Sequence, residues 1–299
     1  MPFRSGFVAI IGRPNVGKST LVNRLVGSKV SIVSPKPQTT RHRILGVRTD
    51  EETQVIYIDT PGVQERADNA MNRIMNRTAR TAAYDVDCAV VVITVDGWGH
   101  EDHLALAAAR ASRAPLGLAV NKIDRFARHD ALLPLIEQSV HEGPFDEIVP
   151  VSARTGLQVD VLERVVRARL PAHPPYFDAD LATDRSDSFF AGELVREQLF
   201  RTLGAEVPYA CAVEIEQFAH TANGLLRIQA VIWIEREGQK GIVIGKDGHT
   251  LKEVGRRARL EMQEIFGAKV FLGLWVRVRE GWADDTRALS RLGYWEGGA

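Results

Sequence analysis

The chain has 299 residues, of which 45% are hydrophobic and 25% are charged. This composition is typical of a soluble globular protein with a core, and it excludes disordered, collagen-like and coiled-coil chains. The length suggests two domains or one large α/β domain. No apolar run approaches the ~20 residues of a membrane-spanning helix, and the first residues lack the apolar stretch of a signal peptide. We therefore expect neither segment.

Positive and negative charges balance, with 38 basic and 38 acidic residues. The balance argues against a uniformly basic surface, but residues 240–259 hold six basic and only two acidic residues. A local excess of this kind can bind a polyanion when the net charge of the chain is zero. Both cysteines, Cys88 and Cys211, lie in apolar, strand-like runs. Buried free thiols and a cytosolic location are the expectation.

Up to about residue 170, short apolar runs alternate with segments of helical spacing. Runs rich in Val and Ile predict strands at 7–11, 54–58, 88–95, 116–120 and 147–151. Apolar spacing predicts helices at 18–26, 70–83, 102–111, 131–140 and 159–170. Continuous apolar strands separated by helices indicate a parallel sheet covered on both faces. Residues 44–49 precede a charged turn and predict one antiparallel edge strand paired with 54–58.

The composition changes at residues 171–188, which are rich in Pro and Asp and poor in aliphatic residues, as linkers are. The following segment predicts a helix, two strands, a glycine-containing connection, a basic helix and a strand, at 191–203, 210–218, 225–235, 241–248, 250–266 and 270–278. That order is typical of a small α+β domain. We expect domains at 1–172 and 189–299, the second ending in a C-terminal helix, with a linker at 173–188.

The pattern G-x-x-x-x-G-K-[ST] lies between the predicted strand 7–11 and the predicted helix 18–26. Glycines let the backbone curl so that N–H groups point at phosphate oxygens, and the helix N-terminus adds its positive dipole end. Lys18 reaches the β- and γ-phosphates and is a catalytic candidate, and the Ser19 hydroxyl ligates Mg²⁺. The nucleotide-binding residues expected here are Gly12, Arg13, Pro14, Asn15, Val16, Gly17, Lys18, Ser19 and Thr20.

A second motif, Asp59, Thr60, Pro61 and Gly62, follows the predicted strand 54–58. A carboxylate at a strand end beside a phosphate loop can hold Mg²⁺, and the Gly62 N–H can meet the γ-phosphate. The alternative is an ordinary turn, because Asp, Pro and Gly are common turn residues. The phosphate loop earlier in the chain favours the nucleotide role.

Two further motifs follow the next buried strands. Asp124 would accept hydrogen bonds from the N1–H and exocyclic amine of guanine, a donor pair that adenine lacks. Asn121 would brace the base and the phosphate loop, with the Lys122 stem over the ring. Ser152 and Ala153, after the strand 147–151, can offer a backbone N–H to the guanine carbonyl. Ligands of open α/β sheets bind at the carboxyl ends of the strands, where all four motifs stand.

In this order the motifs resemble those of the small translation-factor-like GTPases. The resemblance implies a first switch at Pro37, Gln38, Thr39, Thr40, Arg41 and His42. One threonine of that switch would close on Mg²⁺ and the γ-phosphate, acting as a metal ligand and catalytic residue. We expect Thr40 in this role, with Thr39 as the alternative.

Signalling GTPases often place a water-orienting glutamine directly after the second motif, but here that position is Val63 and Gln64 comes one later. An apolar side chain cannot polarise water, so hydrolysis must use another group or need a partner. In the GTPases that the chain resembles, an asparagine at the position of Asn15 marks members that use K⁺ beside the phosphates. The resemblance therefore implies a K⁺ site at Asn15, where a cation could neutralise transferring charge.

In the second domain, a Gly-x-x-Gly loop with an internal lysine connects a short Ile-Val-Ile turn to the basic helix 250–266. Paired glycines let one loop approach a phosphate chain closely, and an apolar groove beside it can take splayed bases. The pattern resembles a type II KH domain, with 241–244 as the short helical turn. The RNA-binding residues expected are Lys240, Ile242, Val243, Ile244, Gly245, Lys246, Asp247, Gly248, Lys252 and Arg256.

Both halves together resemble the bacterial Era GTPases. Further matching stretches are Glu237 to Lys240 and Gly281 to Asp285. The resemblance implies a P-loop α/β domain followed by a KH domain, in a Mg²⁺-dependent GTPase that binds the 3′ end of 16S ribosomal RNA during 30S subunit assembly. It also implies a cytoplasmic monomer with peripheral contact to the inner membrane face.

Two alternatives stay open from the residues. One is a GTPase that acts on tRNA or at another assembly step. The other is a nucleotide-gated RNA-binding module whose hydrolysis is incidental or needs a partner, and the lack of a glutamine at the position of Val63 keeps it open.

Overall fold

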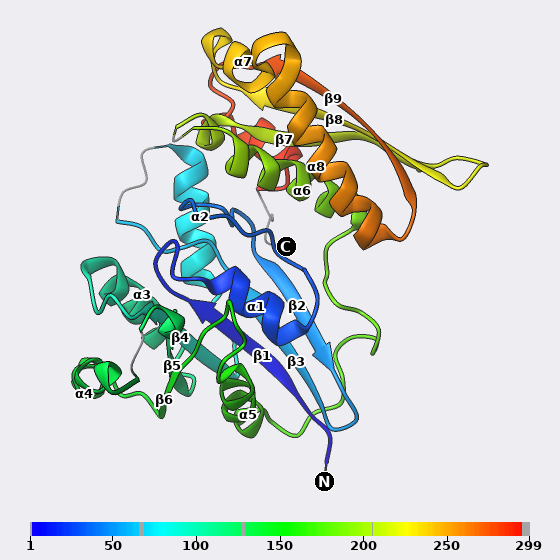
Figure 1. The fold of residues 1–299 in the computed structure, drawn as a ribbon. Coiled ribbons are helices and arrows are strands. Elements are labelled where there is room, and N and C mark those ends of the chain that lie inside the picture. The colour runs from blue at the N-terminus through cyan, green and yellow to red at the C-terminus, as the bar shows by residue number, and fades with distance from the viewer. Residues whose placement is uncertain (1, 66–68, 127–128, 205, 295–299) are drawn as a thin grey trace. The chain divides into compact units, whose positions relative to one another are not determined.

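The computed structural model describes residues 2–65, 69–126, 129–204 and 206–294, and within it the chain forms two compact units (Figure 1). The first unit ends at Asp184 and the second begins at Arg185. Two short earlier segments, Ser34–Thr39 and Asn69–Met71, also belong to the second unit. Each unit has its own hydrophobic core.

The first unit is built on a six-stranded sheet with the order β2-β3-β1-β4-β5-β6. Its strands are β1 (Arg4–Ile11), β2 (Ile44–Thr49), β3 (Thr53–Asp59), β4 (Cys88–Thr94), β5 (Leu116–Asn121) and β6 (Glu147–Pro150). All neighbours pair in parallel except β2, which runs antiparallel to β3. The predicted parallel sheet with one antiparallel edge strand is confirmed.

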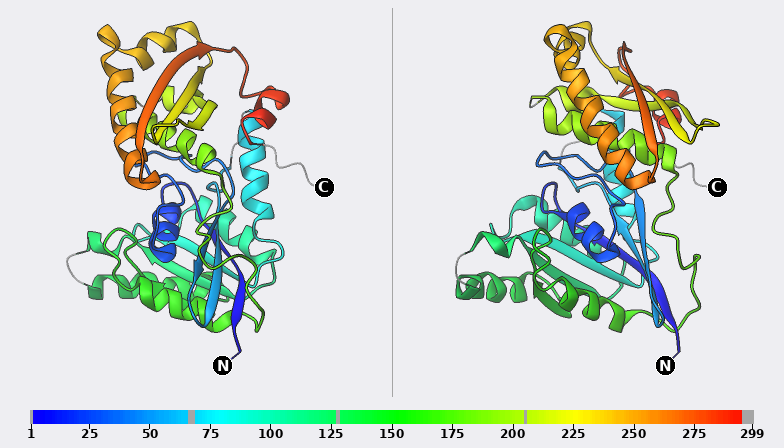
Figure 2. Two further views of the ribbon diagram at one scale, coloured as in Figure 1. Left: turned by 90° about the vertical axis from the view of Figure 1, so that its right-hand side faces the viewer. Right: turned by 45° about the vertical axis from the view of Figure 1, so that its right-hand side comes forward.

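Helices cover both faces of this sheet (Figure 2). They are α1 (Lys18–Val26), α2 (Ala70–Thr81), α3 (His100–Arg110), α4 (Leu133–Glu142) and α5 (Val159–Arg169), with short 3-10 turns η1 (Ile123–Arg125) and η2 (His129–Leu132). Strand residues such as Val8 and Ile10 pack with α1 and α5, whereas Ala9 and Ile11 pack with α2 and α3. Because both sides of each central strand are buried, these strands are apolar throughout and do not alternate with polar residues.

The segment after α5, residues 171–184, lies against the sheet and is called the strap below. Ala172 pairs with Arg4 of β1, and Thr183 pairs with Gly46 of β2. The side chain of Gln54 in β3 binds the central part of the strap. It accepts from the N–H groups of Tyr176 and Phe177 and donates to the Phe177 carbonyl. A segment with linker composition is therefore ordered by hydrogen bonds to the first unit.

The second unit is a three-stranded sheet with the order β7-β8-β9 and helices on one face. Its elements are α6 (Asp187–Thr202), η3 (Val207–Ala210), β7 (Ala212–His220), β8 (Leu225–Ile234), α7 (Glu237–Ile244), η4 (Lys246–Gly248), α8 (His249–Phe266), β9 (Lys269–Val278) and α9 (Thr286–Arg291). Helices α6 and α8 pack together over the core face. The expected α+β order is confirmed. In the described ranges, no helix has both the length and the apolar character needed to cross a bilayer.

Helix α7 is longer than the sequence predicts. The expected turn at 241–244 is the end of a helix that starts at Glu237. The side chain of Gln239 accepts hydrogen bonds from the backbone N–H groups of Glu235 and Arg236, each at 3.0 Å. This cap satisfies donors that would otherwise be unpaired at the helix start, which allows a Gly-containing stretch to become helical.

Candidate functional site

The loop between β1 and α1 depends on two glycines. Gly17 has a φ of 100°, in the left-handed region that favours glycine. At Gly12, a Cβ atom would lie 2.4 Å from the carbonyl oxygen of Val92, so a side chain cannot fit there. The loop thus passes tightly between strands and opens directly into the N-terminus of α1, where backbone N–H groups can receive an anion.

Lys18 is buried in this loop, and its ammonium group donates to the carbonyl oxygens of Gly12 and Arg13, both at 2.9 Å. Burial lowers the pKa of Lys18 to about 8, and the nearby Asp59 carboxylate opposes that shift. A buried ammonium with few compensating charges is stabilised by an arriving phosphate, which supplies negative charge in a low-dielectric site.

Oxygen-bearing side chains suited to Mg²⁺ stand beside the loop. The hydroxyl oxygens of Ser19 and Thr40 are 2.6 Å apart. The Asp59 carboxylate is fully buried, and in the described part of the chain neither oxygen has a hydrogen-bond partner. Burial raises the pKa of Asp59, and the neighbouring Ser19 hydroxyl and then the Lys18 ammonium oppose the rise. An orphaned buried carboxylate beside two hydroxyls fits a hard, oxygen-seeking cation.

The alternative switch residue, Thr39, has different partners. Its hydroxyl lies 2.6 Å from the Ser34 hydroxyl and donates to the Lys36 carbonyl at 2.8 Å. Of the two candidate threonines, Thr40 is the one next to Ser19.

The segment after β3 lies directly against the phosphate loop. A Cβ atom on Gly62 would lie 2.5 Å from the Pro14 nitrogen, so only glycine allows this approach. The Thr60 hydroxyl donates to the Ile10 carbonyl and ties the segment to β1. Val63 is 1% exposed and packs into the core between sheet and helices. An apolar side chain packed in the core cannot orient a water molecule.

A pocket of about 430 Å³ lies at the carboxyl ends of β5 and β6. Its lining consists of Gly17, Thr20, Val33, Asn121, Lys122, Asp124, Arg125, Ala153 and Arg154. The Asn121 amide donates to the Val16 carbonyl at 2.7 Å and accepts from the Ala153 N–H at 3.0 Å. The Lys122 ammonium donates to the Asn15 carbonyl at 2.6 Å, and Asn15 itself has a left-handed φ of 62°. These contacts join the phosphate loop to the base-recognition loops.

Asp124 presents its carboxylate at this pocket. It accepts from the Ser152 hydroxyl at 2.6 Å and pairs with the Arg154 guanidinium at 2.6 Å. The Ser152 hydrogen bond, then the Arg154 charge, hold the pKa of Asp124 below its usual range. Asp124 is thus an anion ready to accept from a base. Sequence reasoning missed Arg154, although its position directly after Ser152 and Ala153 was a usable signal.

Sequence reasoning also missed a polar network behind the phosphate loop. The Arg13 guanidinium Nε lies 3.1 and 3.0 Å from the two oxygens of Asp102, which is 1% exposed. Arg13 also donates to the Thr94 hydroxyl at 3.1 Å, and Thr94 donates to Asp96 at 2.8 Å. Asp102 in turn accepts the Gly99 N–H at the start of α3. The loop is therefore anchored to α3 and to the end of β4.

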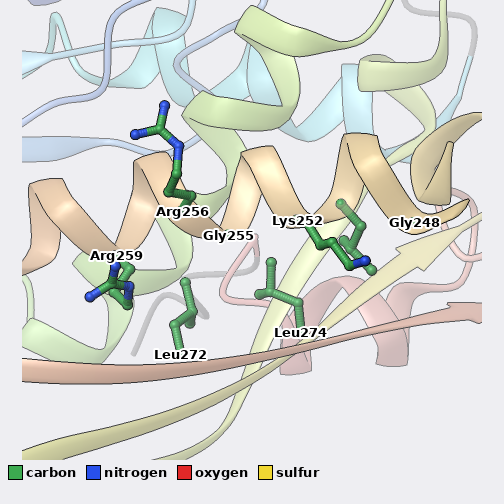
Figure 3. A pocket seen from close by; sticks show the side chains of 8 residues that line it. Gly248, Lys252, Gly255, Arg256, Arg259, Leu272 and Leu274 are labelled. Carbon is green, nitrogen blue, oxygen red and sulfur yellow. The ribbon is translucent and has the colours of Figure 1, made fainter. Parts of the chain in front are cut away.

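In the second unit, the Gly-x-x-Gly loop also requires its glycines. Gly245 and Gly248 have φ values of 73° and 74°, and a Cβ on Gly245 would lie 2.1 Å from the Thr250 hydroxyl oxygen. A groove of about 450 Å³ begins at Gly248 and runs between α8 and β9 (Figure 3). It is lined by Gly248, Leu251, Lys252, Gly255, Arg256, Arg259, Leu272 and Leu274. The arginine and lysine side chains and Leu251 come from α8, whereas Leu272 and Leu274 come from β9.

The remaining candidate RNA-binding residues are exposed or buried according to their position on α7. Ile242 is 53% exposed, whereas Val243 is completely buried in the core of the second unit. The prediction that Val243 contacts bases is therefore wrong, because the helical turn directs its side chain inward. Ile244, Lys246 and Asp247 lie at or beside the loop, and Lys240 pairs with Glu237 at 3.3 Å.

Part of the basic charge on α8 is already compensated. Arg256 and Arg257 both pair with Glu253, and their hydrogen bonds hold the pKa of Glu253 down to about 2. Among the residues that the structure describes, Lys252 donates only to the Asp247 carbonyl, at 3.3 Å. Arg259, which the sequence prediction omitted, also lines the groove.

Comparison with known proteins agrees with this geometry. Residues 7–122 match a family described as 50S ribosome-binding GTPase, and residues 206–283 match the KH domain. The chain is 55% identical over 293 residues to GTPase Era of Stenotrophomonas maltophilia (strain R551-3), covering 98% of both chains. It has the same identity and coverage with GTPase Era of Xanthomonas oryzae pv. oryzae (strain MAFF 311018).

Two solved structures resemble the whole chain. One is Era in complex with MgGDPNP and nucleotides 1506–1542 of 16S ribosomal RNA, with a TM-score of 0.94 and 37% identity, covering 98% of this chain and 99% of that one. The other, an Aquifex aeolicus Era variant bound to GDP and AlF4⁻, has the same TM-score, identity and coverage. The nucleotide motifs, the KH groove and these full-length relatives lead to one conclusion: the chain belongs to the Era family of GTPases.

Proposed function

We propose that this GTPase binds the 3′ end of 16S ribosomal RNA through its second unit and acts in 30S subunit assembly and 16S rRNA maturation. GTP binding and hydrolysis in the first unit would control the RNA-bound state. The solved Era complex with MgGDPNP and nucleotides 1506–1542 of 16S ribosomal RNA supports this assignment. The alternative of a tRNA-directed GTPase has no comparable support.

The observation that carries the proposal is the groove between α8 and β9. Gly248 opens it, so a phosphate can approach the backbone where a side chain would block it. Lys252 and Arg259 provide cations along one wall, and Leu272 and Leu274 provide an apolar wall for bases. This pairing of charge and apolar surface fits single-stranded RNA, whose bases are free to leave the stack.

In the first unit we assign Mg²⁺ to Ser19, Thr40 and Asp59. When bound with GTP, Mg²⁺ neutralises developing charge on the β- and γ-phosphate oxygens. Ser19 and Thr40 would offer hydroxyl oxygens, and the buried Asp59 would hold the hydrated cation. Lys18 would place a point charge on the phosphates, and the Gly62 N–H would donate to the γ-phosphate.

The attacking water needs a group other than Val63, whose side chain is buried in the core. We propose that K⁺, held near Asn15, supplies charge stabilisation in place of an arginine finger. The same burial of Val63 supports the second candidate function, a nucleotide-gated RNA module with slow intrinsic hydrolysis. Single-turnover hydrolysis with and without RNA separates the two: stimulation by RNA supports the first, and tight GTP-dependent RNA binding without stimulation supports the second.

We also propose that the protein is a cytoplasmic monomer. Cys88 and Cys211 are buried free thiols, as expected in a reducing compartment. Contact with the inner face of the membrane would be peripheral, through the surface of a folded unit.

The test of RNA binding is Gly248→Asp. The nearest atom to a Cβ at this position is Lys252 Cε at 3.7 Å, so the side chain fits and places a carboxylate at the groove mouth. Asp also tolerates the left-handed backbone better than most residues. We expect RNA affinity to fall about ten-fold or more, as for loss of a charge-assisted contact, with GTP affinity unchanged.

The matched control is Gly238→Asp, which adds the same charge in the first turn of α7, where a Cβ has nothing within 4 Å. It should leave RNA affinity near that of the unmodified protein. Fluorescence anisotropy with a 3′-end 16S rRNA fragment measures both variants. Equal RNA affinity for both variants and the unmodified protein would contradict the groove assignment.

A further inference from the structure

The outer face of the second sheet carries two exposed aromatic rings. Along β9, Val270 and its alternate neighbours pack into the core, so the residues between them project from the opposite face. Phe271 and Trp275 lie there and are 47% and 44% exposed. Large rings this open, on the same strand face and four residues apart, are unusual for a surface that has only to face water.

The glycine between these rings determines how they lie. A Cβ atom on Gly273 would stand 2.8 Å from Cη2 of Trp275 and 3.8 Å from Cε1 of Phe271. The Trp275 indole therefore extends across Gly273 towards Phe271, and any larger residue would displace it. Packing over Gly273 gives the Trp275 indole a structural role. The Phe271 ring does not share that role.

Uncompensated positive charge flanks Phe271. Arg227 is its register partner on β8, with the guanidinium carbon 5.3 Å from the ring centroid. Lys269 is exposed two residues before Phe271, on the same face. Within the described ranges no carboxylate pairs with Arg227 or Lys269. At the other end of the face, Arg277 pairs with Glu216, so the positive charge is concentrated near Phe271.

We propose that Arg227, Lys269, Phe271 and Trp275 form an outer shelf that stacks unpaired RNA bases. Exposed rings beside free cations suit single-stranded nucleic acid, because rings stack on any base while cations meet the phosphates. A protein partner would have to neutralise the same cations. The proposal rests on the proposed function, since the shelf takes RNA that has already entered the groove.

The topology makes a continuous RNA path feasible. Strand β9 is at the edge of the sheet, and its inner-facing Leu272 and Leu274 line the groove. Phe271 and Trp275 flank these two leucines in the sequence and lie on the reverse face of the same strand. An RNA strand that leaves the groove and passes the edge of β9 reaches the outer shelf with no other strand to cross.

The experiment compares two RNA probes on the full chain. A short probe of about six nucleotides fills the groove, because a KH loop clamps about four nucleotides. A longer probe of about eighteen nucleotides, from the same 3′ end of 16S rRNA, can also reach the shelf. Phe271→Leu and Trp275→Leu should each weaken the long probe about five-fold or more, the effect of losing one base stack. Affinity for the short probe should not change.

Conservative variants separate stacking from packing. Phe271→Tyr and Trp275→Phe keep an aromatic ring and should restore most of the affinity for the long probe, and thermal melting checks that every variant is folded. The outer shelf is refuted if the Leu variants bind the long probe normally, or if the aromatic variants lose as much as the Leu variants. Normal RNA binding with reduced capture by 30S subunits would also refute it, in favour of a protein partner.

The Gly248→Asp variant distinguishes failure of the outer shelf from failure of the proposed RNA-binding function. If that variant loses both probes while the Leu variants lose only the long one, groove and shelf are both supported. If Gly248→Asp binds both probes normally, the groove assignment fails, whatever the Leu variants show.

Discussion

Replacing Asp102 with alanine tests whether the phosphate loop is held in place from α3. Asp102 is 1% exposed, caps α3 by accepting the backbone N–H of Gly99, and pairs with Arg13. Loss of the cap costs about 1 kcal/mol. Breaking a fully buried ion pair costs about 3–5 kcal/mol, but the Arg13 side chain is 26% exposed, so we reduce that contribution to about 1–2 kcal/mol.

Together these losses predict a destabilisation of the first unit by about 2–3 kcal/mol. A unit of this size should then melt roughly 4–12 °C lower. Calorimetry identifies the correct transition, because GDP raises the melting temperature of only the unit that binds it. GDP affinity should fall as well, since the Arg13 carbonyl is one of the two acceptors that hold Lys18.

Asp102→Asn is the matched control, because it keeps an oxygen that can cap α3 but removes the charge that pairs with Arg13. Its melting temperature should fall by less than that of Asp102→Ala. A double-mutant cycle with Arg13→Met should give a coupling well above about 0.5 kcal/mol, the range within which independent sites add. A melting temperature within about 1 °C of the unmodified protein for Asp102→Ala, or additive effects in the cycle, would refute the anchoring role.

Three further predictions concern separate groups of the first unit. Asp124→Asn should reduce GTP affinity at least about 100-fold, through two lost charge-assisted hydrogen bonds, and favour xanthine nucleotides; retained GTP preference over XTP in competition binding contradicts the base-reading role. Hydrolysis should be faster in K⁺ than in Na⁺, and Asn15→Ala should remove the difference; equal single-turnover rates in the two salts would rule out the cation. The hydrogen bond to Glu142 raises the pKa of His103, so its small stabilising effect should be complete below about pH 6.5 and fade as the pH rises through the raised pKa. An NMR titration in which Glu142→Gln leaves the His103 pKa unchanged would contradict that cause.

The sequence predicted those parts of the molecule in which a single structural requirement determines the residue type at each position. The buried strands were visible because a sheet covered on both faces needs apolar residues at every position. The phosphate loop was visible because Gly12, Gly17 and Lys18 must occur at fixed spacing around an anion. The α+β order of the second unit was visible because aliphatic residues occupy every second position of 270–278, as in a strand with one buried face, directly after a basic helix.

Features that join distant residues were not visible. The pair of Arg13 and Asp102 links positions 89 residues apart, and a single aspartate on a predicted helix gives no sign of its partner. The long form of α7 depends on one glutamine side chain capping two backbone groups. On β9, the alternating pattern predicts which residues face the core, but it does not predict a role for Phe271 and Trp275 on the opposite face.

The strap changes where this protein can be divided. The Ala182 carbonyl accepts the Val47 N–H at 2.8 Å, and the Asp184 carboxylate accepts the Leu45 N–H at 3.0 Å, so the strap covers part of the outer side of β2. A fragment that stopped at residue 172 would leave those backbone donors open on an edge strand, together with the Gln54 amide. Open edges of this kind recruit other strands and promote aggregation. A fragment that ends after Asp184 retains these contacts and should remain in solution. Residues 173–184 therefore protect the first unit against aggregation through its edge strand.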